Sequence, residues 1–292
     1  MNVSVIGAGT MGNGIAQLFA QNGHAVTLID LNRDALDRAR QTISGSLDRL
    51  IRKERMTEDD KTATLGRLLD ATDMAEGVSK AELVVEAATE NVELKLKIFT
   101  TLDQAAPAGC LLATNTSSIS ITQIAAATQR PGQVIGMHFM NPVPIMQLVE
   151  VIRGYATTDA TTERVMQLSR DLGKQPVEVR DYPGFVSNRI LMPMINEAVI
   201  TLFEGVAGVM EIDTVMKLGM AHPMGPLQLA DFIGLDTCLA ILRVLQDGFG
   251  HDKYAPCPLL VNMVRAGQLG RKTGIGFYDY SGGGKELVPV KF

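Results

Sequence analysis

The chain of 292 residues is long enough for two domains, each with its own hydrophobic core. It is 46% hydrophobic and 20% charged, as in an ordinary globular protein, and its net charge of −5 argues against a nucleic acid as the main partner. Its apolar runs are interrupted well short of a bilayer span, and a strand is expected from residue 2, so we expect neither a membrane segment nor a signal peptide.

The cysteines and histidines show no metal-ligand spacing. Cys110, Cys238 and Cys257 form no CxxC pair, and the four histidines are scattered along the chain. We therefore expect no metal site, and reduced thiols in a cytoplasmic location.

The first thirty residues predict a strand, a glycine turn, a helix and a second strand. The strands are expected at 2–6 and 25–29, and the helix after the turn. Gly7 permits the tight turn, Gly9 allows a pyrophosphate to approach the backbone, and Gly12 allows the helix to pack closely on the sheet. The free N–H groups at the helix start favour phosphate. The residues expected to contact a dinucleotide here are Gly7, Gly9, Thr10, Met11 and Gly12.

Asp30 follows the second strand and bears on the choice of dinucleotide. Its carboxylate can accept hydrogen bonds from the ribose hydroxyls of NAD and would repel the 2′-phosphate of NADP. Arg33 stands three residues later and could contact that phosphate. NAD is favoured, and NADP stays open.

The next helix, which Asn32 can cap, ends in a basic segment that contains Arg49, Arg52, Lys53 and Arg55. Such a segment is typical of a solvated helix end, where cations complement the dipole. It could instead hold an anionic substrate tail, but spacing alone favours the solvated end.

Strands predicted at 83–87 and 111–114 alternate with helices, which indicates a doubly wound, mostly parallel α/β sheet. Ligands of such sheets bind at the carboxyl ends of the strands. Glu90, Lys95 and Ser117 follow these strand ends. Ser117 is also a candidate N-cap for the helix through Ile121, and position does not separate a structural from a ligand-binding role.

His138 lies at the end of a strand predicted at 134–139, and Glu150 lies inside the next strand, at 148–152. A carboxylate within an apolar strand needs a partner, because unpaired burial is costly. A short connection joins the two strands, so the residues can meet. A histidine held by a carboxylate is a common general base, although a purely structural pair remains possible.

A helix at 162–172 and a strand at 176–179 are expected to complete the sheet domain, and residues 181–184 read as a boundary. We therefore predict a dinucleotide-binding domain at 1–182 and a helical domain at 183–292. The long apolar segment 185–203 and the helices after it carry more apolar surface than one small domain buries, which suggests a homodimer interface.

Seven segments of the sequence resemble those of a known enzyme family, and they follow one another in the order found in that family. They are VIGAGTMGNGIAQ (5–17), VVEAATEN (84–91), ATNTSSISIT (113–122), GMHFMNPVPIMQLVEVI (136–152), DYPGFVSNRIL (181–191), HPMGPLQLAD (222–231) and GRKTGIGFYDY (270–280). The chain thus resembles the L-3-hydroxyacyl-CoA dehydrogenases, in particular the single-function bacterial enzymes that act on 3-hydroxybutyryl-CoA.

The resemblance implies hydride transfer between NAD and a short-chain (S)-3-hydroxyacyl-CoA, as in fatty-acid or butanoate metabolism. It implies that His138 is the catalytic base, that Glu150 orients it, and that Ser117 and Asn188 bind the substrate oxygen. It implies that the cofactor is contacted by Gly7, Gly9, Gly12, Asp30, Glu90, Lys95, Ser117, Asn141 and Lys272. Ser46 and Lys53 match the family's contacts to the CoA tail, which turns the basic helix end into a candidate binding surface.

Two alternatives remain. One is a dehydrogenase of a free hydroxy acid or sugar acid, such as L-gulonate, on the same fold. The other is a protein that binds NAD without chemistry, as a sensor or structural protein. The presence of the whole set Ser117, His138, Glu150 and Asn188 argues against the second alternative.

Overall fold

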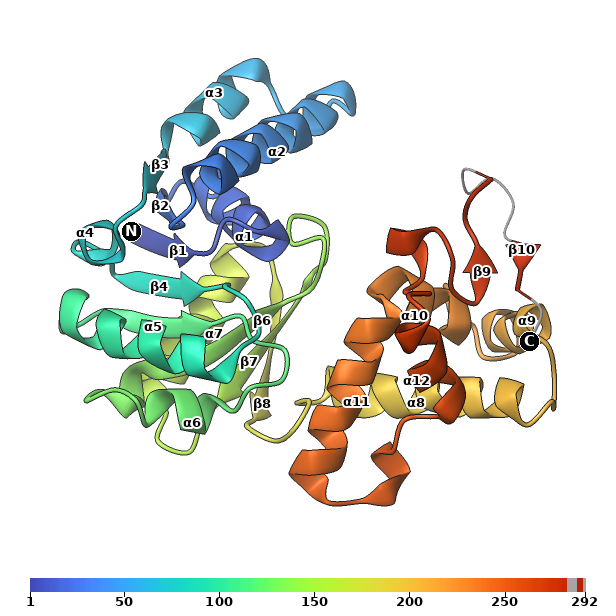
Figure 1. Cartoon of the computed structure of the whole chain (residues 1–292). Helices are drawn as coiled ribbons and strands as arrows, with labels where there is room; N and C mark the ends of the chain where they lie inside the picture. Colours follow the sequence, from blue (N-terminus) through green and yellow to red (C-terminus); the bar gives the residue numbers. More distant parts are fainter. Residues whose placement is uncertain (283–287, 291–292) are drawn as a thin grey trace. The chain divides into compact units, whose positions relative to one another are not determined.

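The computed structural model describes residues 1–282 and 288–290, which form two compact units, Met1–Tyr182 and Pro183–Phe292 (Figure 1). Each unit has its own buried core. No helix of the described residues is long and apolar enough to cross a membrane.

The first unit is an eight-stranded sheet in the order β3-β2-β1-β4-β5-β6-β7-β8, with helices on both faces. All neighbouring strands are parallel except β6 and β7. Its elements are β1 (Asn2–Ile6), α1 (Thr10–Gln21), β2 (Ala25–Ile29), α2 (Arg33–Arg52), α3 (Glu58–Gly66), β3 (Leu68–Ala71), α4 (Met74–Val78), β4 (Leu83–Glu86), α5 (Val92–Ala105), β5 (Leu111–Thr114), α6 (Ile121–Ala125), the 3₁₀ turn η1 (Pro131–Gln133), β6 (Val134–Phe139), β7 (Leu148–Arg153), α7 (Asp159–Asp171) and β8 (Gln175–Arg180).

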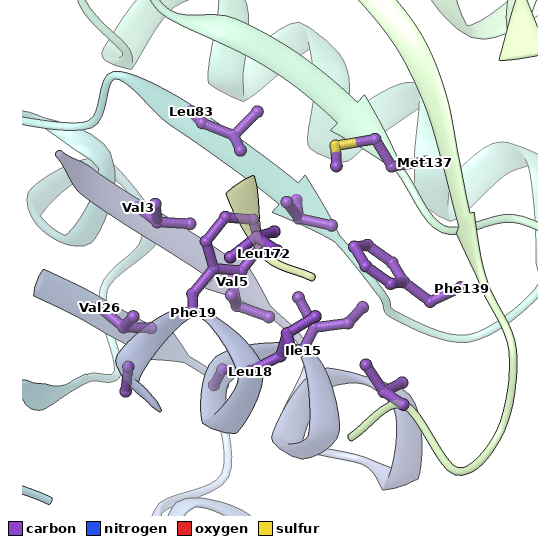
Figure 2. Close-up of a cluster of buried hydrophobic side chains, with 14 of the residues drawn as sticks. Val3, Val5, Ile15, Leu18, Phe19, Val26, Leu83, Met137, Phe139 and Leu172 are labelled. Carbon is purple, nitrogen blue, oxygen red and sulfur yellow. The ribbon is translucent and has the colours of Figure 1, made fainter. Parts of the chain in front are cut away.

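The alternation of side chains along β1 assigns its two faces. Val3 and Val5 join the cluster that contains α1, α2 and α7, and Figure 2 shows Val3 and Val5 beside Ile15 and Phe19 of α1. Ser4, between them, points to the other face, where its hydroxyl donates to the carbonyl of Gly77 in α4. Apolar side chains on both faces give the buried central strands expected of a parallel sheet.

The order of the strands places β1 beside β4, where the direction of winding changes. In open α/β sheets, ligands bind at the carboxyl ends of the strands next to this point. The glycine turn after β1 and the segment after β4 therefore border the expected ligand edge. The doubly wound sheet predicted from the sequence is confirmed.

The second unit is helical, with a short two-stranded ribbon. Its elements are α8 (Ser187–Phe203), α9 (Val209–Gly219), α10 (Pro226–Ile233), α11 (Leu235–Phe249), the 3₁₀ turn η2 (Asp252–Tyr254), α12 (Pro258–Arg265), the 3₁₀ turn η3 (Arg271–Thr273), β9 (Tyr278–Asp279) and β10 (Val288–Pro289). The long apolar segment predicted as a helix forms α8, whose buried side chains include Met192, Ile195 and Val199. Gly250, in a left-handed conformation with φ 59°, ends α11.

The region between α2 and β4 was missed from the sequence. It contains α3, β3 and α4, which contribute few buried residues and therefore show no apolar period. Asn32 caps α2 as predicted, since its side-chain oxygen accepts from the N–H of Asp34 at 2.9 Å.

Candidate active site

Close packing explains two of the glycines in the turn after β1. Gly7 has φ 96°, and a Cβ there would lie 2.7 Å from the carbonyl oxygen of Ala87. A Cβ on Gly12 would lie 1.7 Å from the carbonyl oxygen of Gly7, so α1 can begin here only without a side chain at that position. A Cβ on Gly9 would meet open space. The turn therefore leaves its backbone accessible at Gly9, as close approach of a ligand requires.

A cavity of about 670 Å³ opens beside this turn. Gly7, Gly9, Thr10 and Asp30 are among the residues that line it. The carboxylate of Asp30 accepts from the N–H groups of Ala8 at 2.9 Å and Asn32 at 3.0 Å. These hydrogen bonds hold it at the carboxyl end of β2. The cavity thus combines exposed backbone with a fixed carboxylate, the pair that a dinucleotide requires.

Two basic residues bear differently on this cavity. Arg38 of α2 lines it, a contact that the sequence did not indicate. The guanidinium of Arg33, the candidate for a 2′-phosphate, lies 3.4 Å from the carboxylate of Asp37 and 3.6 Å from that of Asp70. Arg33 thus has carboxylate partners within its own unit.

His138 and Glu150 meet because β6 and β7 are antiparallel and these residues are register partners. His138 Nδ1 lies 2.8 Å from Glu150 Oε2, and the residues are 6% and 2% exposed. A carboxylate only accepts, so Nδ1–H donates to Glu150 and Nε2 is left as the basic nitrogen of the neutral ring. The strands therefore fix both the ring and its tautomer.

Ser117 lies against that basic nitrogen. Its Oγ is 3.0 Å from His138 Nε2. The alternative role of Ser117 as an N-cap is wrong, because Ser120 caps α6 by accepting from the N–H of Gln123 at 3.2 Å. Ser117, His138 and Glu150 thus form a continuous hydrogen-bonded chain after β5, at the carboxyl end of β6 and near the start of β7.

Glu90 fastens the segment that carries Ser117. Its Oε1 accepts from the N–H of Ser117 at 2.9 Å, from the N–H and Oγ of Ser118 at 3.1 Å each, and from Thr116 Oγ1 at 2.5 Å. The family resemblance implied that Glu90 contacts NAD. In the structure, the carboxylate of Glu90 also holds the backbone of residues 115–118, called the serine segment below.

Lys95 is buried, with its Nζ 2.6 Å from Glu86 Oε1 and 3.5 Å from Glu90 Oε2. The sequence reasoning missed Glu86. The available signal was a glutamate that ends the apolar strand 83–86 and therefore needs a partner when buried. Because the side chain of Lys95 is only 1% exposed, its direct contact with NAD stays a prediction.

The turn between β6 and β7 is also held. Lys174, just before β8, donates to the carbonyls of Val143 at 2.6 Å and Met146 at 2.8 Å, and burial lowers its pKa. Asn141 lies in this turn at an exposed position. Asn115, after β5, accepts from the N–H of Phe139 at 2.9 Å. These contacts, none of them predicted, tie the strand ends together around His138.

The remaining predicted residues lie elsewhere. Ser46 is in α2 and Lys53 is its exposed C-cap, seven positions later and hence on the same face of the helix. Asn188 is buried in α8 of the second unit. Lys272 of the second unit donates to Asp236 Oδ2 at 2.7 Å. The contacts within the first unit leave the assignments of these four residues as predictions.

Two family descriptions match the chain. The NAD-binding domain of 3-hydroxyacyl-CoA dehydrogenase matches residues 2–182, and the C-terminal domain of 3-hydroxyacyl-CoA dehydrogenase matches residues 184–280.

Curated proteins and solved structures agree with these matches. A probable 3-hydroxybutyryl-CoA dehydrogenase of Deinococcus radiodurans is 55% identical, covering 96% of this chain and 100% of the relative. A 3-hydroxybutyryl-CoA dehydrogenase of Bradyrhizobium diazoefficiens is 54% identical, over 96% of this chain and 95% of the relative. The crystal structure of (S)-3-hydroxybutyryl-CoA dehydrogenase from Ralstonia eutropha has a TM-score of 0.93 and 52% identity, over 96% of this chain and 99% of that one.

Proposed function

The chain belongs to the 3-hydroxyacyl-CoA dehydrogenase family, and on that premise we propose how its residues serve an NAD-dependent exchange between an (S)-3-hydroxyacyl-CoA and the 3-ketoacyl-CoA. As an enzyme of this family it is an oxidoreductase that uses NAD. We propose a short acyl chain, as in 3-hydroxybutyryl-CoA and acetoacetyl-CoA, because the relatives above are named for that substrate.

The observation that carries the catalytic assignment is the chain of contacts from Glu150 through His138 to Ser117. In the oxidation, Nε2 of His138 accepts the proton of the 3-hydroxyl. Glu150 stabilises the imidazolium that forms, because its carboxylate already accepts from Nδ1–H. In the reduction, the same imidazolium returns the proton to the substrate oxygen.

Ser117 is proposed to bind the substrate oxygen at the position where Nε2 can reach it. Its Oγ lies within hydrogen-bond distance of the ring, so an oxygen bound to Ser117 is brought next to the base. Asn188 of the second unit is proposed as a further ligand of that oxygen on the family resemblance alone.

The chemistry that NAD would supply when bound is acceptance of the hydride that leaves carbon 3 of the substrate. The residues proposed to hold NAD in the first unit are Gly7, Gly9, Thr10, Met11, Gly12, Asp30, Glu90, Lys95, Ser117 and Asn141. Of these, Gly7, Gly9, Thr10 and Asp30 line the cavity beside the glycine turn, and the others are proposed from the family resemblance. Lys272 of the second unit is proposed from the resemblance. The open space at Gly9 and the carboxylate of Asp30 fit a pyrophosphate and an unphosphorylated ribose.

The geometry of Asp30 favours NAD over NADP. Two backbone N–H groups hold its carboxylate at the cavity, where a 2′-phosphate would meet a fixed negative charge. Arg33, whose neighbours are Asp37 and Asp70, would have to leave them to neutralise that phosphate. We therefore expect a clear preference for NADH.

Ser46 and Lys53 are proposed to bind the CoA tail from one face of α2. Lys53 is exposed at the end of the helix, so its ammonium group can contact a phosphate without desolvation of the whole side chain.

The second unit is proposed to form a homodimer. Its described surface exposes large apolar side chains, among them Val206 (71%), Val215 (60%) and Leu218 (82%). Val206 and Val215 also line an apolar cavity of about 410 Å³. An exposed apolar surface of this kind is usually covered by a partner. We also propose a cytoplasmic location, which is supported by three buried cysteines without disulfide bonds.

A steady-state assay tests the proposed reaction. Acetoacetyl-CoA and longer 3-ketoacyl-CoAs are compared with free acetoacetate, each with NADH and with NADPH. We expect turnover of acetoacetyl-CoA with NADH and little turnover of the free acid. A preference for free acetoacetate would support a hydroxy-acid dehydrogenase instead. NADH binding without turnover of any of these substrates would support a protein without chemistry.

A further inference from the structure

Glu86 is a buried carboxylate to which the proposed reaction assigns no task. It is the last residue of β4, it is 0% exposed, and it lies at the edge of the sheet that borders the glycine turn. Its Oε1 accepts from Lys95 Nζ at 2.6 Å and from the N–H of Ala88 at 2.7 Å. Its Oε2 accepts from Thr114 Oγ1 at 2.7 Å.

Two routes connect Glu86 to the segment that carries Ser117. The first runs through Lys95, whose Nζ lies between Glu86 and Glu90, and Glu90 accepts from the N–H of Ser117. The second runs through Thr114, whose hydroxyl donates to Glu86 and accepts from the N–H of Thr116 at 3.2 Å. Both ends of the serine segment thus depend on one buried carboxylate.

The charges make the position of Lys95 sensitive to Glu86. One ammonium group faces two carboxylates, and the shorter distance, 2.6 Å against 3.5 Å, is to Glu86. If Glu86 lost its charge, Lys95 would be attracted to Glu90 alone. Glu90 would then be drawn away from the N–H groups of Ser117 and Ser118, and Ser117 Oγ would move relative to His138 Nε2.

Stability is a weak explanation for such a pair. The desolvation cost of two fully buried charges can exceed their attraction, and apolar replacements of similar volume are often neutral or stabilising. We propose that Glu86 is a positioning residue, which through Lys95 and Thr114 holds Glu90 and the segment 115–118 and thereby sets Ser117 against His138. The proposal rests on the proposed function, because the effect of that position is measured in turnover.

The test is a mutant cycle between Glu86→Gln and Ser117→Ala, assayed with acetoacetyl-CoA and NADH. A displacement of about 1 Å at a reacting group can cost about 10²-fold, so we expect Glu86→Gln to lower kcat by about 10- to 100-fold. Because the loss passes through Ser117, the same change in the Ser117→Ala background should lower kcat by less than about twofold. An equal loss in both backgrounds, or no loss in the wild-type background, would overturn the proposal.

Asp103→Asn is the matched control. Asp103 lies on α5, the helix that carries Lys95, and like Glu86 it pairs with a cation, Arg130 at 2.8 Å. Among the described residues it makes no contact to the serine segment. We expect this variant to lower thermal stability and to leave kcat unchanged. A loss of kcat like that of Glu86→Gln would assign the effect to general weakening of α5.

A second variant covers misfolding of Glu86→Gln. The double change Glu86→Gln with Lys95→Met removes both buried charges, so no unpaired ion is left in the core. It should show the same loss of kcat and the same dependence on Ser117, and full kcat in this variant would overturn the proposal.

Hydrogen exchange separates failure of this proposal from failure of the proposed function. If the wild type does not turn over acetoacetyl-CoA, the proposed function fails, and the peptide covering 114–119 still reports on positioning. Its amides should exchange faster in Glu86→Gln than in the wild type, and faster than in Asp103→Asn. Unchanged exchange would overturn the positioning role.

Discussion

Two pairs of buried carboxylates, one pair in each unit, have opposite surroundings. In the first unit, Glu86 faces Lys95 and Glu150 faces His138. In the second unit, Asp213 and Asp231 are as deeply buried, at 2% and 1% exposed, but their partners among the described residues are neutral.

The neutral partners of the second pair are backbone and tyrosine groups. Asp213 accepts from the N–H of Leu227 at 2.8 Å and from Tyr278 Oη at 2.8 Å. Asp231 accepts from the N–H groups of Phe277 and Tyr278 at 2.9 Å each. These bonds fasten the start of β9 and the residue before it to α9 and α10. Burial raises the pKa of Asp231 to about 6, although the hydrogen bonds oppose that shift.

The difference between the pairs teaches how burial and function are related here. A carboxylate with a cationic or titratable partner can stabilise a charge that appears during a reaction. A carboxylate held by neutral donors fastens a segment and bears the cost of its own charge. Exposure alone would not separate the two pairs.

The largest effect should come from the base itself. Because general-base help is worth about 10²–10⁴ in rate, His138→Gln should lower kcat by roughly that factor. NADH affinity, measured by fluorescence titration, should stay close to that of the wild type. His251→Gln, which alters an exposed histidine, serves as the control. Full activity of His138→Gln would exclude His138 from the mechanism.

The next effect concerns stability and pH at Asp231. Its folded-state pKa is raised, so between about pH 4 and 6 the folded state binds more protons than the unfolded state, and stability falls as pH rises. A shift of roughly 2 units corresponds to about 3 kcal/mol in total, of which about 2 kcal/mol lies between pH 4.5 and 7.5.

Asp231→Asn removes this titration. Urea unfolding of both proteins should therefore be measured at about pH 4.5 and about pH 7.5. The free energy of unfolding of the wild type, relative to that of the variant, should be about 2 kcal/mol higher at pH 4.5 than at pH 7.5. Asp247→Asn, at an exposed position of α11, should show no such change. A difference independent of pH would mean that Asp231 does not titrate in this window.

Glu150→Gln should have a smaller effect on turnover than His138→Gln. Hydrogen bonds to charged groups are worth about 1.5–3 kcal/mol, which corresponds to a loss of about 10- to 100-fold in kcat. The loss should appear in kcat with acetoacetyl-CoA and NADH, because Glu150 no longer stabilises the imidazolium that forms during the reaction. Glu178→Gln, which breaks an exposed pair with Arg153, is the control. A kcat equal to that of the wild type would make the pair structural.

The smallest effect is expected for an exposed charge. Lys53→Ala should raise KM for acetoacetyl-CoA by less than about fivefold, because exposed ion pairs are worth about 0.2–1 kcal/mol. The effect should shrink at high salt. Lys80→Ala, an exposed lysine elsewhere in the first unit, should leave KM unchanged. Equal KM for Lys53→Ala and wild type at low salt would remove Lys53 from the CoA site.

Much of the fold could be predicted because its pattern is local. The bounds of β1, β2, β5 and β6 agree with the sequence prediction, since each is a short apolar strand between turn residues. The helices of the second unit were also found from their apolar period. The region of α3, β3 and α4 was missed because so little of it is buried.

The site was predicted less completely because its contacts join distant positions. The meeting of His138 and Glu150 followed from two adjacent strands, and the structure shows it. The contact of Ser117 with His138 joins segments 21 residues apart, and strand order alone could not separate it from a helix cap. The pairing of Glu86 with Lys95 was not predicted, because a glutamate at a strand end usually faces solvent.

The antiparallel register of β6 and β7 bears on how this protein can tolerate insertions and deletions. The acid–base pair is specified by two facing strand positions, so a change in the connection 140–147 leaves the pair intact only if the two strands stay aligned. A slip of one residue would turn one partner of the pair to the opposite face. Lys174 donates to two carbonyls of that connection and therefore helps to keep β6 and β7 in register.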